Sequence, residues 1–179
     1  MAASASVENA ITIRPLRVED AAAWRALRLE ALQKSPRAFL MSYEEAAKDD
    51  LAAFAAHIPP PESADVIFGA FADDALAGST GFSVRRRLKE RHKGAIWGVY
   101  VQPHLRGRGV AKALMQAAIA HARQHVAILQ LTAGAENAAA RTLYENLGFT
   151  VYGSERRAMR LDGREYDDVH LALYLDEHP

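Results

Sequence analysis

The sequence VYVQPHLRGRGVA at residues 99–111 holds the signals around which the rest of the chain is arranged. Its first residues are apolar, as in a β-strand, and Pro103 ends that strand because proline cannot donate to a sheet ladder. Gly107 and Gly109 follow, and a residue without a Cβ can adopt a positive φ and let another group approach the main chain closely. The pattern predicts a strand, a basic glycine turn and a helix that begins at Val110.

The turn and the start of the helix together predict a site for a phosphate or pyrophosphate group. The first amide N–H groups of a helix have no intrahelical acceptor, and the positive end of the helix dipole lies at the same place. Arg106 and Arg108 add two positive charges. Hydrogen bonds to a charged group contribute roughly 1.5–3 kcal/mol each, so several main-chain amides suffice to hold a diphosphate.

Three other interpretations of the glycine turn were weighed against this one. A Walker P-loop is excluded because GxxxxGK[ST] occurs nowhere in the chain. The dinucleotide pattern GxGxxG is matched only at Gly107 and Gly109, since its third position is Lys112, and residues 102–106 separate the strand from the first glycine. An ordinary strand-to-helix loop with solvated arginines stays open on the turn alone.

Length and composition are those of one globular domain with a full hydrophobic core. The chain has 179 residues, 50% hydrophobic and 25% charged, with 22 Lys+Arg against 22 Asp+Glu. A net charge of zero argues against a broad nucleic-acid or membrane surface. The absence of cysteine excludes disulfides, thiolate catalysis and cysteine–zinc sites. The sequence shows neither an apolar run of about 20 residues nor a secretion signal, so we expect a cytoplasmic protein.

Hydrophobic periodicity and turn residues predict an α/β fold. Strands are expected at 11–13, 66–71, 76–84, 95–101, 126–132, 149–152, 157–161 and 165–175, and helices at 18–34, 49–57, 110–125 and 136–147. This order predicts a mixed, mostly antiparallel central sheet of about seven strands with helices on both faces. Residues 1–9 are expected to be a disordered tail and residues 10–176 to form a single domain.

Three local features of these elements can also be predicted. The strand at 95–101 is apolar nearly throughout, which predicts burial on both faces. The helix at 110–125 should pack through an alanine-rich face that contains Ala111, Met115, Ala118 and Ala122. The basic run at 85–93 lies between two strands, which favours a solvated hairpin loop over a nucleic-acid site.

A second motif, NAAARTLYENLGF at residues 137–149, follows the glycine turn after about 25 residues. It matches the pattern Nxx(A)xxLYxxxGF, and residues 104–109 match [Q/R]xxGx[G/A] except for His104 at the first position. With both motifs in order and a strand between them, residues 10–175 resemble the GNAT superfamily of acetyl-CoA-dependent acetyltransferases. The resemblance implies the GNAT fold and a metal-free enzyme that moves an acetyl group from acetyl-CoA to a primary amine of a small molecule or protein by direct transfer.

The same resemblance implies which residues hold acetyl-CoA. The strand residues expected at its pantetheine arm are Val99, Tyr100 and Val101, with main-chain groups of Val99 and Val101 hydrogen-bonding the arm like a missing strand. The amides expected to hold its pyrophosphate belong to Arg106, Gly107, Arg108, Gly109, Val110 and Ala111. Asn137 would contact the pantetheine through its amide, or serve as a plain helix N-cap.

Catalysis is implied for Tyr144, which would protonate the CoA thiolate as it leaves. An alternative stays open, because Ala140, Leu143, Tyr144 and Leu147 fall at i, i+3, i+4 and i+7, the spacing of a core face. Some members of the superfamily carry a glutamate on the strand before the turn, where this chain has Trp97. Substitutes for that base are a water chain or one of several side chains, namely Glu44, Glu45, Glu90, His92 and Asp167.

The acceptor site is implied at residues 35–45 and 166–168. Acids beside aromatic residues in these segments would suit a cationic amine. The residues alone favour the alternative, in which Phe39 and Tyr43 pack and the acids face solvent. The missing strand glutamate also leaves a second function open, a non-catalytic acyl-CoA-binding or sensor module on the same fold. Similar enzymes often form homodimers, and a homodimer is therefore a further expectation.

Overall fold

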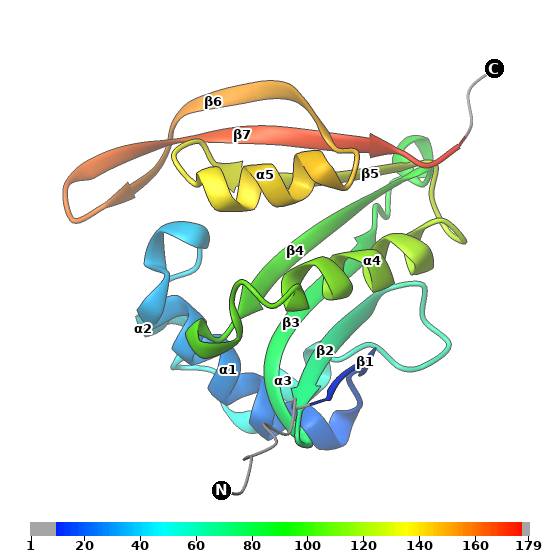
Figure 1. Cartoon of the computed structure of the whole chain (residues 1–179), viewed down its shortest axis with the longest axis vertical. Coiled ribbons are helices and arrows are strands. Elements are labelled where there is room, and N and C mark those ends of the chain that lie inside the picture. The colour runs from blue at the N-terminus through cyan, green and yellow to red at the C-terminus, as the bar shows by residue number, and fades with distance from the viewer. Residues whose placement is uncertain (1–9, 177–179) are drawn as a thin grey trace, which may run out of the picture.

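The computed structural model describes residues 10–176, so the expected tail at 1–9 lies outside the described residues. Figure 1 shows the arrangement of the elements. The helices are α1 (Ala21–Lys34), α2 (Tyr43–Ala46), α3 (Leu51–His57), α4 (Val110–Ala122) and α5 (Ala138–Asn146), with 3₁₀ turns η1 (Val18–Asp20), η2 (Pro36–Ala38), η3 (Leu88–Glu90) and η4 (Pro103–Leu105). The strands are β1 (Ile11–Pro15), β2 (Val66–Ala72), β3 (Ala75–Val84), β4 (Lys93–Val101), β5 (Ile128–Gly134), β6 (Thr150–Leu161) and β7 (Arg164–Tyr174).

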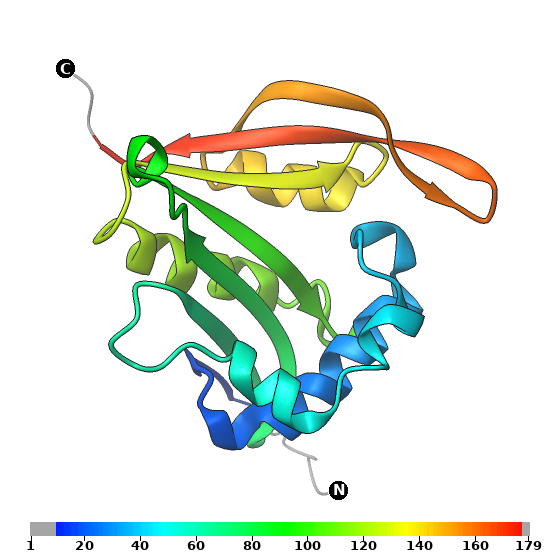
Figure 2. The ribbon, with the colours of Figure 1, turned by 180° about the vertical axis from the view of Figure 1, so that it is seen from behind.

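The strands form one sheet in the order β1-β2-β3-β4-β5-β7-β6. β4 and β5 run parallel, and the other neighbouring pairs are antiparallel. In Figure 1, α4 and α5 lie in front of the sheet, and Figure 2, from behind, brings α1 and α3 to the front. The predicted mixed, mostly antiparallel sheet with helices on both faces is therefore confirmed.

The sequence pattern does not predict α2, which lies between η2 and α3. A capping box begins this helix: the Glu45 N–H donates to Ser42 Oγ at 3.2 Å, and the Ser42 N–H donates to Glu45 Oε2 at 2.8 Å. The predicted loop at 85–93 is confirmed, since it folds as a mostly exposed connection containing η3. In the described part of the chain, no helix is long and apolar enough to cross a membrane.

β4 and β5 pair only at their first residues and then diverge. Residues Lys93–Ala95 of β4 lie beside Ile128–Gln130 of β5, and the ladder goes no further. β4 is bulged beyond this point, because Gly98 has φ +66° and the register against β3 shifts between Ser79 and Gly81. Figures 1 and 2 both show the two strands opening into a V, which splits the sheet on one side.

The prediction that β4 is buried on both faces is wrong. Ile96 and Tyr100 are each 5% exposed, but Trp97 is 38% exposed. Past the split, β4 has no strand on one side, and Trp97 lines open cavities instead of a packed layer. An apolar run of residues is therefore compatible with a strand that lines a cavity as well as with a strand buried on both faces.

The main core lies between α4 and the sheet. Met115, Ala118 and Ala122 are buried as predicted, whereas Ala111 is only partly covered. The buried face of α4 also includes Val110, Leu114 and Ile119. Burying a large aliphatic side chain contributes roughly 1.5–3 kcal/mol, so this face fixes the start of α4 against the sheet.

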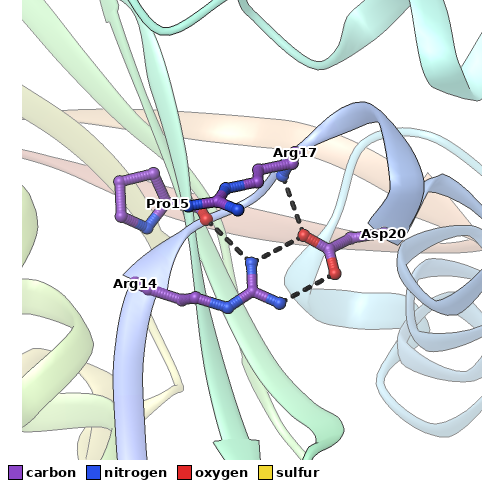
Figure 3. A network of polar contacts seen from close by, with 4 residues as sticks. All are labelled: Arg14, Pro15, Arg17 and Asp20. Carbon is purple, nitrogen blue, oxygen red and sulfur yellow. Dashed lines mark hydrogen bonds and ion pairs between the residues drawn. The ribbon is translucent and has the colours of Figure 1, made fainter.

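A polar network joins the end of β1 to the start of α1 (Figure 3). The Arg14 guanidinium donates to Asp20 through Nη1 at 2.7 Å and Nη2 at 2.9 Å, and the Arg17 N–H donates to Asp20 Oδ2 at 2.8 Å. The Arg14 hydrogen bonds hold the pKa of the Asp20 carboxyl below its ordinary value. The network fixes where α1 leaves the sheet, and α1 forms one side of the region described next.

Candidate active site

The split between β4 and β5 holds a cavity of about 510 Å³. Its walls come from β4, the glycine turn, the first turn of α4, the end of β5, and α5. The predicted site residues that line it are Val99, Tyr100, Val101, Arg106, Gly107, Gly109, Val110, Ala111, Asn137 and Tyr144. Arg108 is the predicted residue that does not line the cavity.

The glycine turn presents main-chain amides to open space. Gly107 and Gly109 have φ of 74° and 79°, and a Cβ added at either would have no atom within 4 Å. Within residues 10–176, the amides of 107–109 donate to no protein acceptor, and the next amides, in the first turn of α4, have none within the helix. The Leu105 side chain, 2% exposed, is buried in the hydrophobic core and anchors the turn there. The geometry therefore provides the cradle of amides that the sequence predicts.

Arg106 does not extend into this cradle. Its Nε donates to the Val101 carbonyl at 3.0 Å, and its guanidinium carbon lies 5.6 Å from the centre of the Tyr100 ring. The side chain thus ties the turn back to the end of β4. Arg108 and Lys112 make no ion pair within the described residues, so they supply the uncompensated positive charge near the turn.

The main chain of β4 has a free edge along the cavity. The Gln102 N–H donates to the Ala77 carbonyl of β3 at 2.9 Å. Because main-chain groups alternate in direction along a strand, those of Tyr100 also point toward β3, and those of Val99 and Val101 point toward the split. β5 is too far away to pair with them. Because Arg106 occupies the Val101 carbonyl, the groups left free are the N–H and C=O of Val99 and the N–H of Val101.

Tyr100 faces away from the split and holds α1 in place. Its hydroxyl donates to Glu30 Oε1 at 3.0 Å, and Gln102 Nε2 donates to Glu30 Oε2 at 2.8 Å. Burial, together with the Glu30 carboxylate, raises the pKa of Tyr100 to about 12. The Tyr100 side chain therefore joins β4 to α1 at the edge of the cavity.

Tyr144 points into the cavity from α5. The side chain is 7% exposed and packs edge-to-face on Phe149 with ring centres 6.1 Å apart. Its hydroxyl makes no hydrogen bond within residues 10–176, and burial raises the pKa of Tyr144 to about 12. The phenol is therefore protonated at neutral pH, with a proton available for a group placed in the cavity.

Asn137 begins α5. Its Oδ1 accepts the Ala140 N–H at 3.1 Å, the geometry of an N-cap. The side chain also lines the cavity, so its Nδ2 group can donate there while Oδ1 caps the helix. The two interpretations of Asn137 are thus compatible.

A second cavity, of about 640 Å³, adjoins the first. The two share Phe39, residues 96–98 of β4 and residues 131–134 of β5, so they meet within the split, beside the bulge of β4. The second cavity is walled by α1, residues 37–41 and the β6–β7 hairpin. Of the segments that the sequence predicts for an acceptor site, residues 37–41 and Asp168 line this cavity. Tyr166 and Asp167 line a smaller cavity of about 310 Å³ instead, to which Asp168 also belongs.

Asp168 on β7 lies in this second cavity, and it makes no ion pair with any described residue. It is 7% exposed, and its side chain makes no hydrogen bond within the described residues. Burial raises the pKa of Asp168, and the neighbouring Glu155 carboxylate raises it further. His170 lies two residues along the same strand on the same face, and its Nε2 is 3.6 Å from Glu155 Oε2.

The side chains predicted from the sequence as possible bases do not occupy the position of Asp168 in the second cavity. Glu44, Glu90 and His92 line neither cavity. Glu45 caps α2, and Asp167 Oδ1 accepts the Arg157 N–H at 2.8 Å. The sequence pattern includes Asp168 in the acceptor segment 166–168 but does not single it out as a base. Strand alternation, which puts Asp168 on the same face as His170, is the signal that could have identified it. No group of three or more metal-binding side chains occurs within residues 10–176.

The split sheet and the row of helix-terminal amides agree with the fold that the two sequence motifs imply. The model of the acetyltransferase (GNAT) family matches residues 23–149, so the chain belongs to this family, as the two sequence motifs indicate. Membership in this family makes the chain an acetyltransferase. Comparison with curated proteins finds no match.

Solved structures share the fold over nearly the whole chain. A putative acetyltransferase from Salmonella typhimurium, solved with its cofactor acetyl-CoA, is 24% identical with a TM-score of 0.83, covering 95% of this chain and 96% of that one. An N-acetyltransferase from Staphylococcus aureus Mu50 is 20% identical with a TM-score of 0.79, covering 93% and 99%. The ribosomal-protein-S18-alanine N-acetyltransferase from Escherichia coli is 22% identical with a TM-score of 0.72, covering 95% and 97%.

Proposed function

We propose that this protein transfers the acetyl group of acetyl-CoA directly to the primary amine of a small molecule or protein. The observation that carries the proposal is that two cavities meet at Trp97 and Gly98 on the bulge of β4. One cavity is walled by main chain that suits a diphosphate and an amide-rich arm, and the other by side chains. Two bound substrates would therefore meet without a covalent enzyme intermediate, and positioning alone supplies a large share of the rate.

The residues of the first cavity fit acetyl-CoA. The open space over Gly107 and Gly109 would take the pyrophosphate, held by the amides of 107–111. The free edge of Val99 and Val101 would pair with the pantetheine arm, as an added strand pairs with a sheet edge. Asn137 Nδ2 would donate to the same arm.

Tyr144 is the general acid in this proposal. Acetyl-CoA supplies the acetyl group on a thioester, so transfer to nitrogen breaks the carbon–sulfur bond and leaves a thiolate that needs a proton. The buried Tyr144 hydroxyl has its proton at neutral pH and no competing acceptor within the described residues. It can therefore donate to the sulfur as the bond breaks.

Asp168 is the base in this proposal. The attacking amine must lose a proton, because an ammonium has no lone pair. Asp168 lies in the second cavity without a hydrogen bond, and its raised pKa makes the ionised form a stronger base than an ordinary carboxylate. The proton passes to the Asp168 carboxylate directly or through a water, so both ends of the transfer have a named group.

Trp97 favours the second candidate, a non-catalytic acyl-CoA sensor. It fills the position where some family members carry a glutamate, and its indole covers Gly81 so closely that a Cβ there would lie 2.2 Å from the ring.

Purified protein is incubated with acetyl-CoA and a panel of amines, and free thiol is followed. Amine-dependent thiol release supports the enzyme. A melting temperature raised by CoA with no thiol release from any amine supports the sensor. A cytoplasmic location and a homodimer stay predictions.

A further inference from the structure

Arg28 is a cation without a partner on the wall of the acceptor cavity. Within residues 10–176, its guanidinium makes no hydrogen bond and no ion pair, and its Nη1 atom is shut off from solvent with no acceptor. The contact that it does make is with Phe39, whose ring centre lies 4.5 Å from the guanidinium carbon. Burial lowers the pKa of Arg28, although an arginine stays charged at neutral pH.

Arg25, one turn earlier on the same helix, shows how such a side chain is ordinarily satisfied. Its Nε donates to the Asp49 carbonyl at 3.1 Å and its Nη2 to the Ala47 carbonyl at 3.4 Å, while its guanidinium lies over Phe54. Both arginines pack on an aromatic ring, but only Arg25 has acceptors. A desolvated charge without a counter-ion costs free energy, so the environment of Arg28 favours an anion.

Arg28 lies beside the point where the two cavities meet. Its Nη1 is 3.7 Å from the position that a Cβ would take on Gly98, the bulge residue of β4. An anionic group held by Arg28 would therefore be a short covalent distance from an amine presented at Gly98 to the first cavity. The opposite wall, from β6 and β7, carries Asp168 and Glu155.

We propose that Arg28 binds the carboxylate of the acceptor, and that the acceptor is a free amino acid, with its carboxylate close to the reacting amine. This inference rests on the proposed function. A carboxylate fits the fork of N–H groups on a guanidinium, and its single negative charge would neutralise the positive charge of Arg28. The cationic amine then points toward Asp168, so the cavity binds both charged groups of a zwitterion.

Other cations near the cavity do not compete for this role. Arg37 is ion-paired with Glu136 and lies over Tyr166 at 4.2 Å. Arg85 is exposed at the rim. A polyamine or a protein N-terminus has no carboxylate next to its amine, and either would leave Arg28 unpaired.

The test compares natural α-amino acids with their own carboxamides as acceptors in the thiol-release assay. Each pair keeps the amino group and side chain and differs in the charge that Arg28 would bind. We expect the wild type to prefer the amino acids by about tenfold or more in kcat/KM, since hydrogen bonds to charged groups are strong. Equal use of both members of each pair, or preference for the carboxamides, overturns the proposal.

The variant Arg28→Met removes the charge and keeps most of the volume. It should lower kcat/KM for the amino acids by about tenfold to a hundredfold, leave the carboxamides within about twofold, and leave the affinity for acetyl-CoA unchanged. Arg28→Lys should restore part of the preference. Arg25→Met is the matched control: it should lower the melting temperature and leave the ratio of amino acid to carboxamide unchanged. An unchanged ratio in Arg28→Met overturns the proposal.

A binding readout separates this proposal from the proposed function. The melting temperature is measured in saturating CoA with each amino acid or its carboxamide. If no acceptor releases thiol, the proposed function fails, and stabilisation by amino acids that Arg28→Met abolishes still supports the carboxylate site. If thiol is released but carboxamides stabilise wild type and Arg28→Met as well as amino acids do, the carboxylate site fails while the proposed function stands.

Discussion

The two sides of the split sheet are built in opposite ways. On the proposed donor side, the binding groups would be mainly the amides and carbonyls of one continuous stretch of main chain, β4 through the first turn of α4. The acceptor side uses side chains from α1, residues 37–41 and the β6–β7 hairpin, which are far apart in sequence. Main-chain groups are the same for every residue type, so we expect the donor side to tolerate a change such as His104. On the proposed acceptor side, a single side chain such as Arg28 or Asp168 would set the chemistry.

The largest effect should come from Tyr144, which lines the donor side of the site. Tyr144→Phe removes the proton donor and keeps the ring on Phe149. We expect kcat to fall by about a hundredfold or more, because general acid catalysis contributes roughly 10²–10⁴. The affinity for acetyl-CoA, measured by calorimetry, should not change. A kcat equal to that of the wild type would place Tyr144 in the core alone.

Asp168→Asn tests the acceptor side by itself and should have the next largest effect. We expect kcat/KM to fall by about tenfold to a hundredfold at neutral pH and to lose the acidic limb of its pH profile. The raised pKa means that ionisation of Asp168 in the folded protein costs stability, and this cost grows as pH rises through the folded pKa. Melting curves should therefore show Asp168→Asn no less stable than the wild type at pH 7. Loss of stability together with unchanged kinetics would make Asp168 structural.

Asp20→Asn should change the stability of α1 without changing the donor side. We expect the free energy of unfolding to fall by about 1 kcal/mol at pH 7, because Asp20 accepts from Arg14 and Arg17 but solvent screens the partly exposed Arg14. The Asp20 pKa is lowered on folding, so its contribution is present above the unfolded pKa and is lost as pH falls through the folded value. Urea unfolding should show the difference at pH 7 and a smaller one near pH 3, with unchanged affinity for acetyl-CoA.

The same contrast explains which features could be predicted from the sequence. The glycine turn and the start of α4 depend on local residues, since glycine takes the positive φ of positions 107 and 109 without strain. Alternating apolar runs likewise predict the strands. Trp97 was misjudged because an apolar residue on β4 has the same pattern whether a helix or a cavity covers it.

The acceptor side could not be predicted in the same way. Arg28 lies on an ordinary amphipathic helix, and its sequence neighbours do not show that Arg25 finds carbonyl acceptors while Arg28 finds none. Asp168 differs from Asp167 only in the face of β7 on which it lies, and the β6 bulge gives Asp167 its partner. Such differences arise from tertiary contacts over long sequence separations.

The most direct test of the main-chain cradle is a calorimetric titration of acetyl-CoA into the wild type, Gly109→Val and Gly163→Val. Both glycines have positive φ and open space around a Cβ, but Gly163 lies in the turn of the β6–β7 hairpin. Both variants therefore carry similar backbone strain, and only Gly109→Val adds bulk to the cradle. The account predicts a Kd at least about tenfold higher for Gly109→Val and unchanged for Gly163→Val. An unchanged Kd in a folded Gly109→Val, or equal weakening in both variants, would contradict it.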